Sequence, residues 1–483
     1  MSINSPTPDA PPPVEPVSGS SAAPAGGPAE EYERRLVPEH ATKPLRSFIA
    51  IFSSEHVAAT ELLIGPLFVV HGVGAFDLLV GLLLGNALAV LSWTFITAPI
   101  AVMKRLTLYY QLEKIGGARL VDIYNLANGV LWCFIAAAMI SVSATAVGVP
   151  LKIKMPELTD YLPNSVGMVV VVFVLGAVIS VIAARGYDSL ARFAVISAPW
   201  MAVMFVVVGI VALAKLGVST PAQFWDVANN VVWKGGNPQP GFPKFTFWHV
   251  LFFSWFGNIA WHIGMGDLSL FRYARKSSYG LASATGMYLG HYIAWIAAGL
   301  LYAIQLVNDP SDTKLAAGPL GYNIGGVAGI ALVLIAGWTT ANPIIYRAGL
   351  AFQGLNPKWS RFRVTLAAGA LASIIAVFPG LSAKFLSVAA LYGLILMPMG
   401  AVIFADHYWM KPLGMREFYA EQTGIRFYLP PAVAWLATLL ICLVLNQQFG
   451  VQIFFLALPA WFIAAAIYIV LSKMHQRNAG GCA

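Results

Sequence analysis

The residues best suited to chemistry in this sequence are polar groups that interrupt two otherwise apolar stretches. Glu61 lies in the first stretch, and Gly257, Asn258, Trp261 and His262 lie in the second. A carboxylate among apolar residues can pair with a protonated nitrogen or take up a proton, and a histidine can also relay a proton. We therefore take these residues as candidates for a solute-binding site.

Structural explanations compete with this interpretation. Glu55 and His56 lie about two turns from the start of their stretch, and Asp267 lies near an end, so all three fit equally well as interface groups. The glycines that follow His262 fit close helix packing as well as an unwound backbone. Glu61 and His262 lie deeper in apolar sequence, which favours a functional role for these two.

A third group of residues has the spacing of a cation site. Ala336, Thr339 and Thr340 are spaced i, i+3 and i+4, so on a helix they share one face. A carbonyl and two hydroxyls on one face suit a small, hard cation, although threonines in membrane helices often bond only to the preceding turn. Trp132 is by default a core or lipid-facing aromatic residue, but its indole is also a natural platform for a flat heterocycle.

These groups must lie in membrane-spanning helices, because the composition excludes a soluble domain. The chain is 58% hydrophobic and only 10% charged, with a mean hydropathy of +0.73. Its three cysteines are widely separated, which predicts neither a disulfide framework nor a zinc site. Apolar runs of bilayer-crossing length predict an all-α membrane protein of about 12 transmembrane helices. The predicted spans are 48–71, 76–103, 119–148, 165–184, 193–214, 246–266, 283–306, 323–349, 364–379, 385–404, 428–446 and 451–471.

The positively charged residues predict the orientation of this bundle. With an even number of spans and the N-terminus inside, every arginine and half of the lysines fall in cytoplasmic segments. The net charge of +8 is therefore a topology signal, and its dispersal among loops argues against a nucleic-acid partner. We predict a multi-pass protein of the cell inner (plasma) membrane, with both termini cytoplasmic and no cleaved signal peptide.

The start of the chain is rich in proline, glycine and serine and cannot bury enough apolar surface to fold. We therefore expect a disordered cytoplasmic tail at 1–46, a ten-helix core at 47–404, two peripheral transmembrane helices at 405–472 and a short cytoplasmic tail at 473–483. The interrupted spans are the first and the sixth, which begin the two halves of the core. Interruptions at matching places predict an inverted-repeat transporter whose site lies between unwound helices at mid-membrane.

Two other classes of membrane protein fit the sequence less well. A channel also needs many spans and a polar lining, but it gives no reason for two broken helices at matching places. A membrane enzyme needs a convergent set such as His-Glu-x-x-His or a Ser/His/Asp group, and none appears at usable spacing. We therefore predict no enzymatic activity and no cofactor.

Several motifs of the chain resemble the nucleobase–cation symport-1 family, the permeases for cytosine, uracil, purines, allantoin and hydantoins. The most specific are Gly-Asp-Leu-Ser-Leu-Phe-Arg-Tyr-Ala-Arg at 266–275 and Gly-Trp-Thr-Thr-Ala-Asn-Pro at 337–343, followed by Asn-Pro-Lys at 356–358. Leu-Gly-Asn at 84–86 and Gly-Gly-Ala at 116–118 add weaker support. The resemblance covers nearly the whole membrane region and implies a 5+5 inverted repeat plus two peripheral helices, the fold of the sodium-coupled amino-acid transporters.

The resemblance also implies roles for residues of the solute site. Trp132 falls on the tryptophan that stacks on the substrate ring in the hydantoin permease, and Asn258, beside the matching Gly257, replaces a second stacking tryptophan. The glutamine expected one turn after Trp132 is missing, since Ala136 stands there. These departures imply a smaller, more polar or partly cationic ligand. Glu61 then either pairs with a protonated nitrogen of the substrate or holds a coupling proton.

By the same resemblance, Ala336, Thr339 and Thr340 fall on the family's sodium site, which backbone carbonyls of the broken first span complete. We therefore predict a secondary active transporter that imports a small nitrogen-containing heterocycle by symport with Na+, or with H+, through alternating access. Its partners are a small-molecule substrate, a cation and the lipid bilayer, and we expect a monomer. The alternative within transport is a carrier of the same fold for a betaine, an amino acid or a small cationic nitrogen compound.

Overall fold

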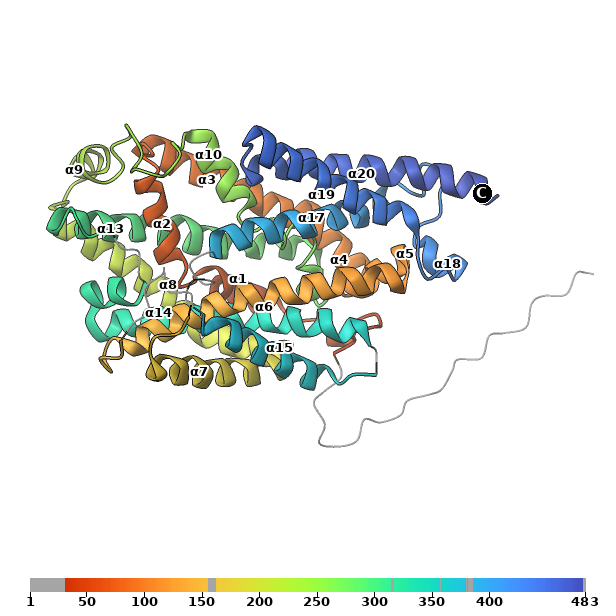
Figure 1. Ribbon diagram of the computed structural model, residues 1–483, viewed down its shortest axis with the longest axis horizontal. Helices are drawn as coiled ribbons and strands as arrows, with labels where there is room; N and C mark the ends of the chain where they lie inside the picture. The colour runs from red at the N-terminus through yellow and green to blue at the C-terminus, as the bar shows by residue number, and fades with distance from the viewer. Residues whose placement is uncertain are drawn as a thin grey trace, which may run out of the picture.

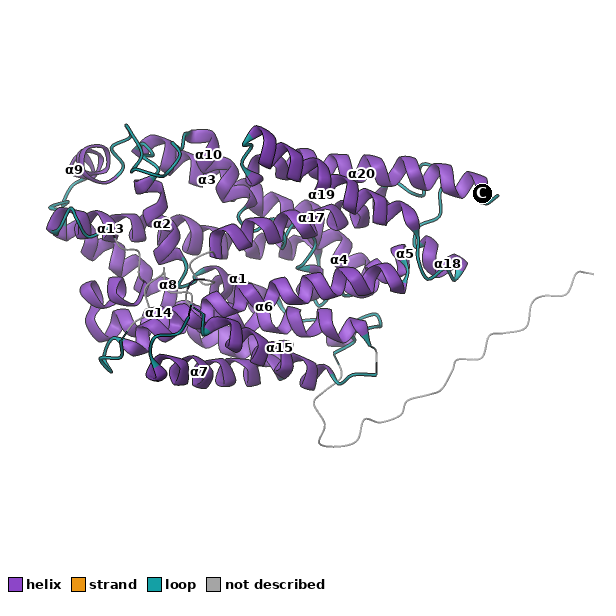
Figure 2. Ribbon diagram, viewed as in Figure 1, coloured by secondary structure: helices purple, strands orange, loops and turns teal. Residues whose placement is uncertain are grey.

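The helices of the protein run largely side by side in one bundle (Figure 1). The structure is a computed structural model that describes residues 31–154, 162–313, 317–356, 358–378, 380 and 385–480. Every regular element of these residues is a helix, and none is a strand (Figure 2). This agrees with the apolar sequence, because a helix in lipid satisfies its backbone polar groups within itself.

The helices differ widely in length, and several are short turns that lie between longer ones. Inside α14 the backbone of Gly326 has a φ of 53°, so this helix contains a kink. The α-helices are α1 Leu45–His56, α2 Glu61–Val70, α3 Ala75–Ser92, α4 Ala98–Lys104, α5 Leu108–Gly116, α6 Ala118–Gly148, α7 Val166–Ala184, α8 Tyr187–Lys215, α9 Pro221–Val227, α10 Phe247–Phe256, α11 Leu268–Phe271, α12 Ser283–Thr285, α13 Trp295–Asn308, α14 Ala317–Leu355, α15 Arg361–Ala376, α17 Phe385–Tyr408, α18 Tyr419–Thr423, α19 Leu429–Phe449 and α20 Ile453–Asn478. The 3₁₀ and π turns are η1 Glu39–Ala41, η2 Trp93–Thr97, η3 Ala228–Val232, η4 Ser277–Ala282 and η5 Gly286–Ala294.

Each of the predicted spans overlaps a helix of the structure. Among the described residues, nine helical stretches are long and apolar enough to cross a membrane, and the bent pair of α1 and α2 makes a tenth. The helices of the remaining two predicted spans are too short to be counted among these. The sixth is represented by α10, which has 10 residues, and the ninth by α15, which has 16.

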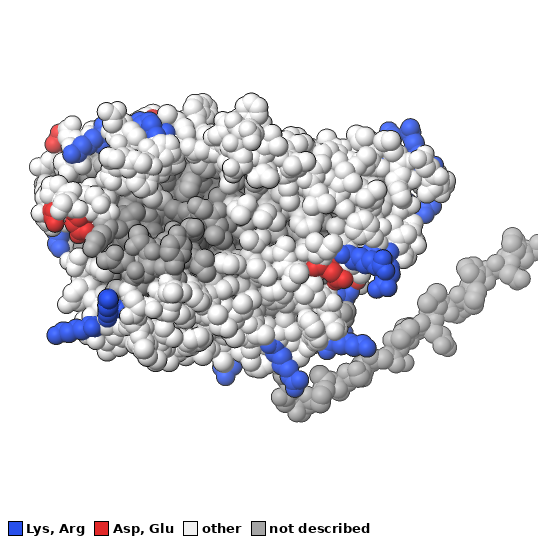
Figure 3. Space-filling model, viewed as in Figure 1, with Lys and Arg blue, Asp and Glu red and all other residues white. Residues whose placement is uncertain are grey.

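The surface of the bundle suits a lipid environment. On the face shown in Figure 3, most of the broad middle is uncharged, and lysine and arginine side chains gather mainly toward the two ends. Helix α7 exposes large apolar side chains at Val166, Val170, Phe173 and Val174. An apolar outer surface on long apolar helices identifies a multi-pass membrane protein.

Both of the predicted interruptions are present. Helix α1 ends at His56 and α2 begins at Glu61, with a bend of 53° between them. Helix α10 ends at Phe256, and the chain then runs through turns until α11 begins at Leu268. The sixth span, predicted at 246–266, is therefore helical only in its first half, because its glycine-rich second half is unwound.

The Gly65–Pro66 pair does not mark the break in the first span. The break precedes it, and Pro66 lies inside α2. Gly65 instead permits close packing, since a Cβ atom at this position would lie 2.3 Å from the carbonyl oxygen of Trp295 in α13. The close contact between α2 and α13 depends on a residue without a side chain.

Helices at equal places in the two halves of the core pack against each other. The third and eighth spans, α6 and α14, lie along each other, as do the fourth and ninth, α7 and α15 (Figure 1). An inverted repeat produces this pairing. The last two helices, α19 and α20, pack against each other and against α17. Helix α20 continues to Asn478, into the predicted tail at 473–483, of which residues 481–483 lie outside the described residues.

The packed chain begins earlier than predicted. Residues 1–30 of the expected tail lie outside the described residues, but 31–46 lie against the bundle. The backbone amide of Tyr187 donates a hydrogen bond to Glu31 Oε1, and Arg272 Nη1 donates one to the carbonyl of Tyr32 at 2.8 Å. These buried polar contacts hold the segment in place, so the predicted tail boundary at residue 46 is too late.

Candidate functional site

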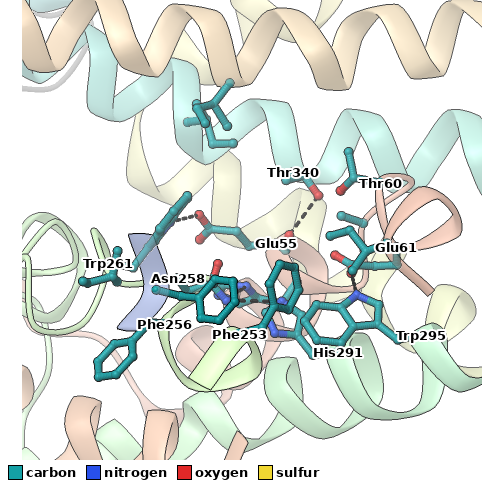
Figure 4. A pocket seen from close by; sticks show the side chains of 18 of the residues that line it. Glu55, Thr60, Glu61, Phe253, Phe256, Asn258, Trp261, His291, Trp295 and Thr340 are labelled. Carbon is teal, nitrogen blue, oxygen red and sulfur yellow. Dashed lines mark hydrogen bonds between the residues drawn. The ribbon is translucent and has the colours of Figure 1, made fainter. Parts of the chain in front are cut away.

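A cavity lies where the break between α1 and α2 meets the break after α10 (Figure 4). Its volume is about 110 Å³, measured as the space open to the centres of water molecules. A single water needs roughly 10–15 Å³ on that measure, so the cavity has room for a small molecule. Its aromatic lining is Phe253, Phe256, Trp261, Trp295 and Phe454, and its polar lining is Glu55, His56, Thr60, Glu61, Asn258, His291 and Thr340.

Glu61 is the first residue of α2, so the break in the first span turns its side chain toward the cavity. The residue is 3% exposed, and its carboxylate accepts a hydrogen bond from Trp295 Nε1 on α13. The close packing of α13 at Gly65 brings this tryptophan within reach. No ion pair involves Glu61 among the described residues.

Asn258 lies at the start of the unwound segment, beside Gly257, and connects two histidines. Its Nδ2 atom lies 3.4 Å from His56 Nδ1 and 3.2 Å from His291 Nε2. The His291 ring stacks on Trp295, with centroids 4.4 Å apart and planes 10° apart. The end of α1, the unwound sixth span and η5 therefore meet at this side of the cavity (Figure 4).

A buried group of charges lies directly beside the cavity. Arg347 of α14 donates hydrogen bonds to both carboxylate oxygens of Glu55 and to Asp267 Oδ1. The indole of Trp261 donates to Glu55 Oε1 at 2.7 Å, and the indole of Trp93 donates to Asp267 Oδ2 at 2.6 Å. Glu55 and Asp267 are thus partners of a buried cation and not interface groups. Arg347 therefore connects α14 with the end of α1 and with the unwound segment after α10.

The expected cation-site residues lie against the break in the first span. The hydroxyl of Thr340 is 2.9 Å from the carbonyl oxygen of Glu55 and 3.0 Å from that of Ala336. The hydroxyl of Thr339 is 2.9 Å from the same Ala336 oxygen and 3.5 Å from Met201 Sδ. Because α1 ends here, its last carbonyls have no amide partner in the next turn. Two carbonyls and two hydroxyls therefore come together, a donor set that suits a hard cation.

Two residues predicted for the solute site lie elsewhere. Trp132 is fully buried and packs edge-on against Trp261 at 5.0 Å, so Trp261 lines the cavity and Trp132 lies behind it. His262 is also fully buried, and its Nε2 lies 3.0 Å from the carbonyl oxygen of Trp255. The turn after α10 directs Trp261 toward the cavity and its neighbour His262 away from it. Of the predicted residues, Glu61, Gly257, Asn258, Trp261 and Thr340 line the cavity.

Sequence reasoning missed three residues of this centre, namely His291, Trp295 and Arg347. A histidine four residues before a tryptophan in the seventh predicted span was an available signal, since the pair shares one helix face. Arg347 was counted with the cytoplasmic loop charges because it lies near the end of the eighth predicted span, yet it is 0% exposed. Counting every arginine as a cytoplasmic loop charge, the step that predicts the orientation of the bundle, therefore concealed that Arg347 lies at the centre of the protein.

Comparison with known proteins reveals the fold alone. No family model and no curated protein matches the sequence. Among solved structures, Mhp1, a nucleobase-cation-symport-1 family transporter in a closed conformation with bromovinylhydantoin bound, aligns with a TM-score of 0.71 at 14% identity, covering 93% of this chain and 96% of that one. A Na+-coupled sialic acid symporter in a substrate-bound outward-open state aligns with a TM-score of 0.65 at 14% identity, covering 92% of each chain. Mhp1 in an inward-facing conformation gives 0.63 at 14% identity, with 93% and 95% covered.

Proposed function

We propose that this protein is a secondary active transporter that couples the uptake of a small nitrogen-containing heterocycle, or a related compound, to the entry of Na+. The observation that carries the proposal is the contact between Thr340 Oγ1 and the carbonyl oxygen of Glu55, at 2.9 Å. It connects α14 to the break in the first span, beside a cavity lined by Glu61 and Asn258. The shared fold with two kinds of symporter supports the same conclusion.

Sodium binding at this contact gives a physical route to coupling. A cation held by the oxygens of Glu55, Ala336, Thr339 and Thr340 ties α14 to the end of α1. The same end of α1 presents His56 to the cavity, and the break that follows it presents Glu61. The cation and the solute therefore favour one arrangement of the broken helix, and each raises the affinity of the site for the other.

The lining favours a flat solute. Trp261, Trp295 and Phe253 present aromatic surfaces to the cavity, and such surfaces stack well on heterocycles. A betaine or amino-acid carrier is the alternative within transport. H+ in place of Na+ is the second candidate for the coupling ion, because Glu61 is a buried carboxylate without an ionic partner among the described residues.

The remaining features of the proposal follow from the sequence. The protein works as a monomer in the plasma membrane with both termini in the cytoplasm, and it carries its solute without chemical change or a cofactor. The orientation rests on the arginines other than the buried Arg347, which gather in one set of predicted connecting segments.

Uptake into proteoliposomes tests the function. Purified protein is reconstituted, and radiolabelled nucleobases, hydantoins, betaines and N-methylated pyridines are offered with an inward gradient of Na+ or of K+. We expect at least one of them to accumulate with Na+ only. The double variant Thr339→Ala, Thr340→Ala should lose at least tenfold of the sodium stimulation, because it removes both hydroxyls while keeping the apolar packing of α14.

Several outcomes would contradict parts of this function. Equal uptake in Na+ and K+, or full sodium stimulation in the double variant, would remove the sodium site. Flux at channel rates would favour a pore, and recovery of a chemically altered solute would favour an enzyme. A sodium-independent uptake that follows a pH gradient would assign the coupling to H+.

A further inference from the structure

We propose that the transported solute is a cation and that Glu61 selects it. The inference rests on the proposed function and narrows it to one class of substrate. That class is the small monocations whose charge lies on nitrogen, such as an N-alkylated aromatic ring, a guanidinium or a quaternary ammonium group.

The charges at the centre of the molecule are unbalanced without a bound cation. Arg347 is the cation that pairs with Glu55 and Asp267, so this group alone has one more negative than positive charge. Glu61 adds another carboxylate and has no ionic partner among the described residues. One Na+ beside the Glu55 carbonyl balances one of the two excess charges. The other is balanced when a monocationic solute lies against Glu61, whereas a buried carboxylate left unpaired is costly.

The described residues compensate the negative charge of the Glu61 carboxylate only in part. The N–H of Trp295 donates to the carboxylate, but this donor is neutral. Glu61 is also the first residue of α2, where the helix dipole supplies roughly half of a positive charge. Both features orient and favour the carboxylate without neutralising it. They hold it ready for a positively charged ligand.

The rest of the lining also suits a cation. The Nδ2 atom of Asn258 is directed to His56 and His291, and its Oδ1 accepts no hydrogen bond from the described residues. Asn258 thus offers the cavity an acceptor. The rings of Phe253 and Trp295 line the same space, and aromatic rings attract cations through their faces. A lining of hydrogen-bond acceptors and aromatic rings disfavours an anionic solute, and it disfavours a solute that has hydrogen-bond acceptors but no donors.

Matched pairs of probes test the charge of the solute directly. Thermal stability of the purified full chain is measured in Na+ with 1-methylnicotinamide against nicotinamide, and with choline against betaine. Each pair keeps the shape similar and changes the net charge from positive to neutral. We expect a cationic member to stabilise the native protein at a concentration at least tenfold below its neutral partner.

Variants of Glu61 assign that preference to one residue. Glu61→Gln keeps the size and removes the charge, so the affinity for the cation should fall by roughly 10- to 100-fold, to that of the neutral partner. Glu61→Asp keeps the charge and should keep the preference. Glu39→Gln, at a surface carboxylate whose side chain is 90% exposed, serves as the matched control and should change nothing.

The inference is overturned if neither cation stabilises the native protein, if the neutral members do so equally, or if Glu61→Gln retains the preference. The first two of these outcomes are measured on the native protein, so the inference can be tested even if a Glu61 variant fails to fold. Repeating the assay in K+ separates this inference from the proposed function. A cation preference that persists without any effect of Na+ would refute sodium coupling and leave the role of Glu61 intact.

Discussion

At the scale of single residues, the centre of the protein depends on Arg347. Its guanidinium has two carboxylate partners and lies over the ring of Trp132, with the centroid 5.3 Å away. The sequence motifs contain Asp267 and show Glu55 in an apolar stretch, but no pattern states that one arginine joins them. Contacts between residues nearly three hundred positions apart follow from packing and not from local spacing.

Replacing Arg347 should therefore destabilise the protein strongly. Arg347→Gln leaves two buried carboxylates without a cation, which typically costs about 3–5 kcal/mol. Arg347→Lys keeps the charge but cannot reach both partners with a planar fork, so we expect an intermediate loss. The midpoint of thermal unfolding in detergent measures both. Arg363→Gln, at an exposed arginine of α15, is the control, and equal midpoints for it and Arg347→Gln would show that the ion group is not structural.

The tryptophans show where residue-level prediction fails. Trp132 was expected to stack on the solute, and the structure places Trp261 between it and the cavity. Both residues occur in the sequence as aromatic groups of apolar segments. Which of them faces the cavity depends on the turn after α10, where Met265 has a positive φ of 66°. That turn cannot be derived from hydrophobic periodicity.

At the scale of elements, the sequence predicts that the first and sixth spans are broken, and both breaks are present. The exact position of the first break comes from the structure, in which α1 stops at His56 and α2 begins at Glu61. The glycines that matter most for this contact lie on the partner element. A Cβ atom at Gly290 of η5 would lie 1.8 Å from the carbonyl oxygen of His56, so η5 closes on the end of α1 only because it has glycine there.

A methyl group at this contact should separate the two elements. Gly290→Ala forces the end of α1 away from η5, and overpacking of this kind costs roughly 1–3 kcal/mol. We expect a lower unfolding midpoint and reduced solute uptake, because His56 and Asn258 lie beside the same contact. Gly209→Ala is the matched control, since the nearest atom to its new Cβ is 3.6 Å away. Identical behaviour of the two variants would contradict the close approach.

At the scale of the whole molecule, composition and charge predict the class and the spans, and the two interruptions at matching places predict the inverted repeat. The class and the spans depend on sums over many residues, so errors at single positions do not matter. The cavity depends on a few residues from α1, α2, α10, η5 and α14 meeting at one point. The family resemblance correctly anticipates the fold, which the alignment with Mhp1 and the sialic acid symporter reveals, while the lining is specific to this chain.

The central claim is that a cation and a solute stabilise the same arrangement of two broken helices. Isothermal titration of the purified protein with Na+, with and without the solute that accumulates in proteoliposomes, tests this most directly. We predict that the solute tightens Na+ binding, and Na+ tightens solute binding, by the same factor, on the order of 5- to 150-fold. An affinity for Na+ that is the same with and without the solute would contradict the claim.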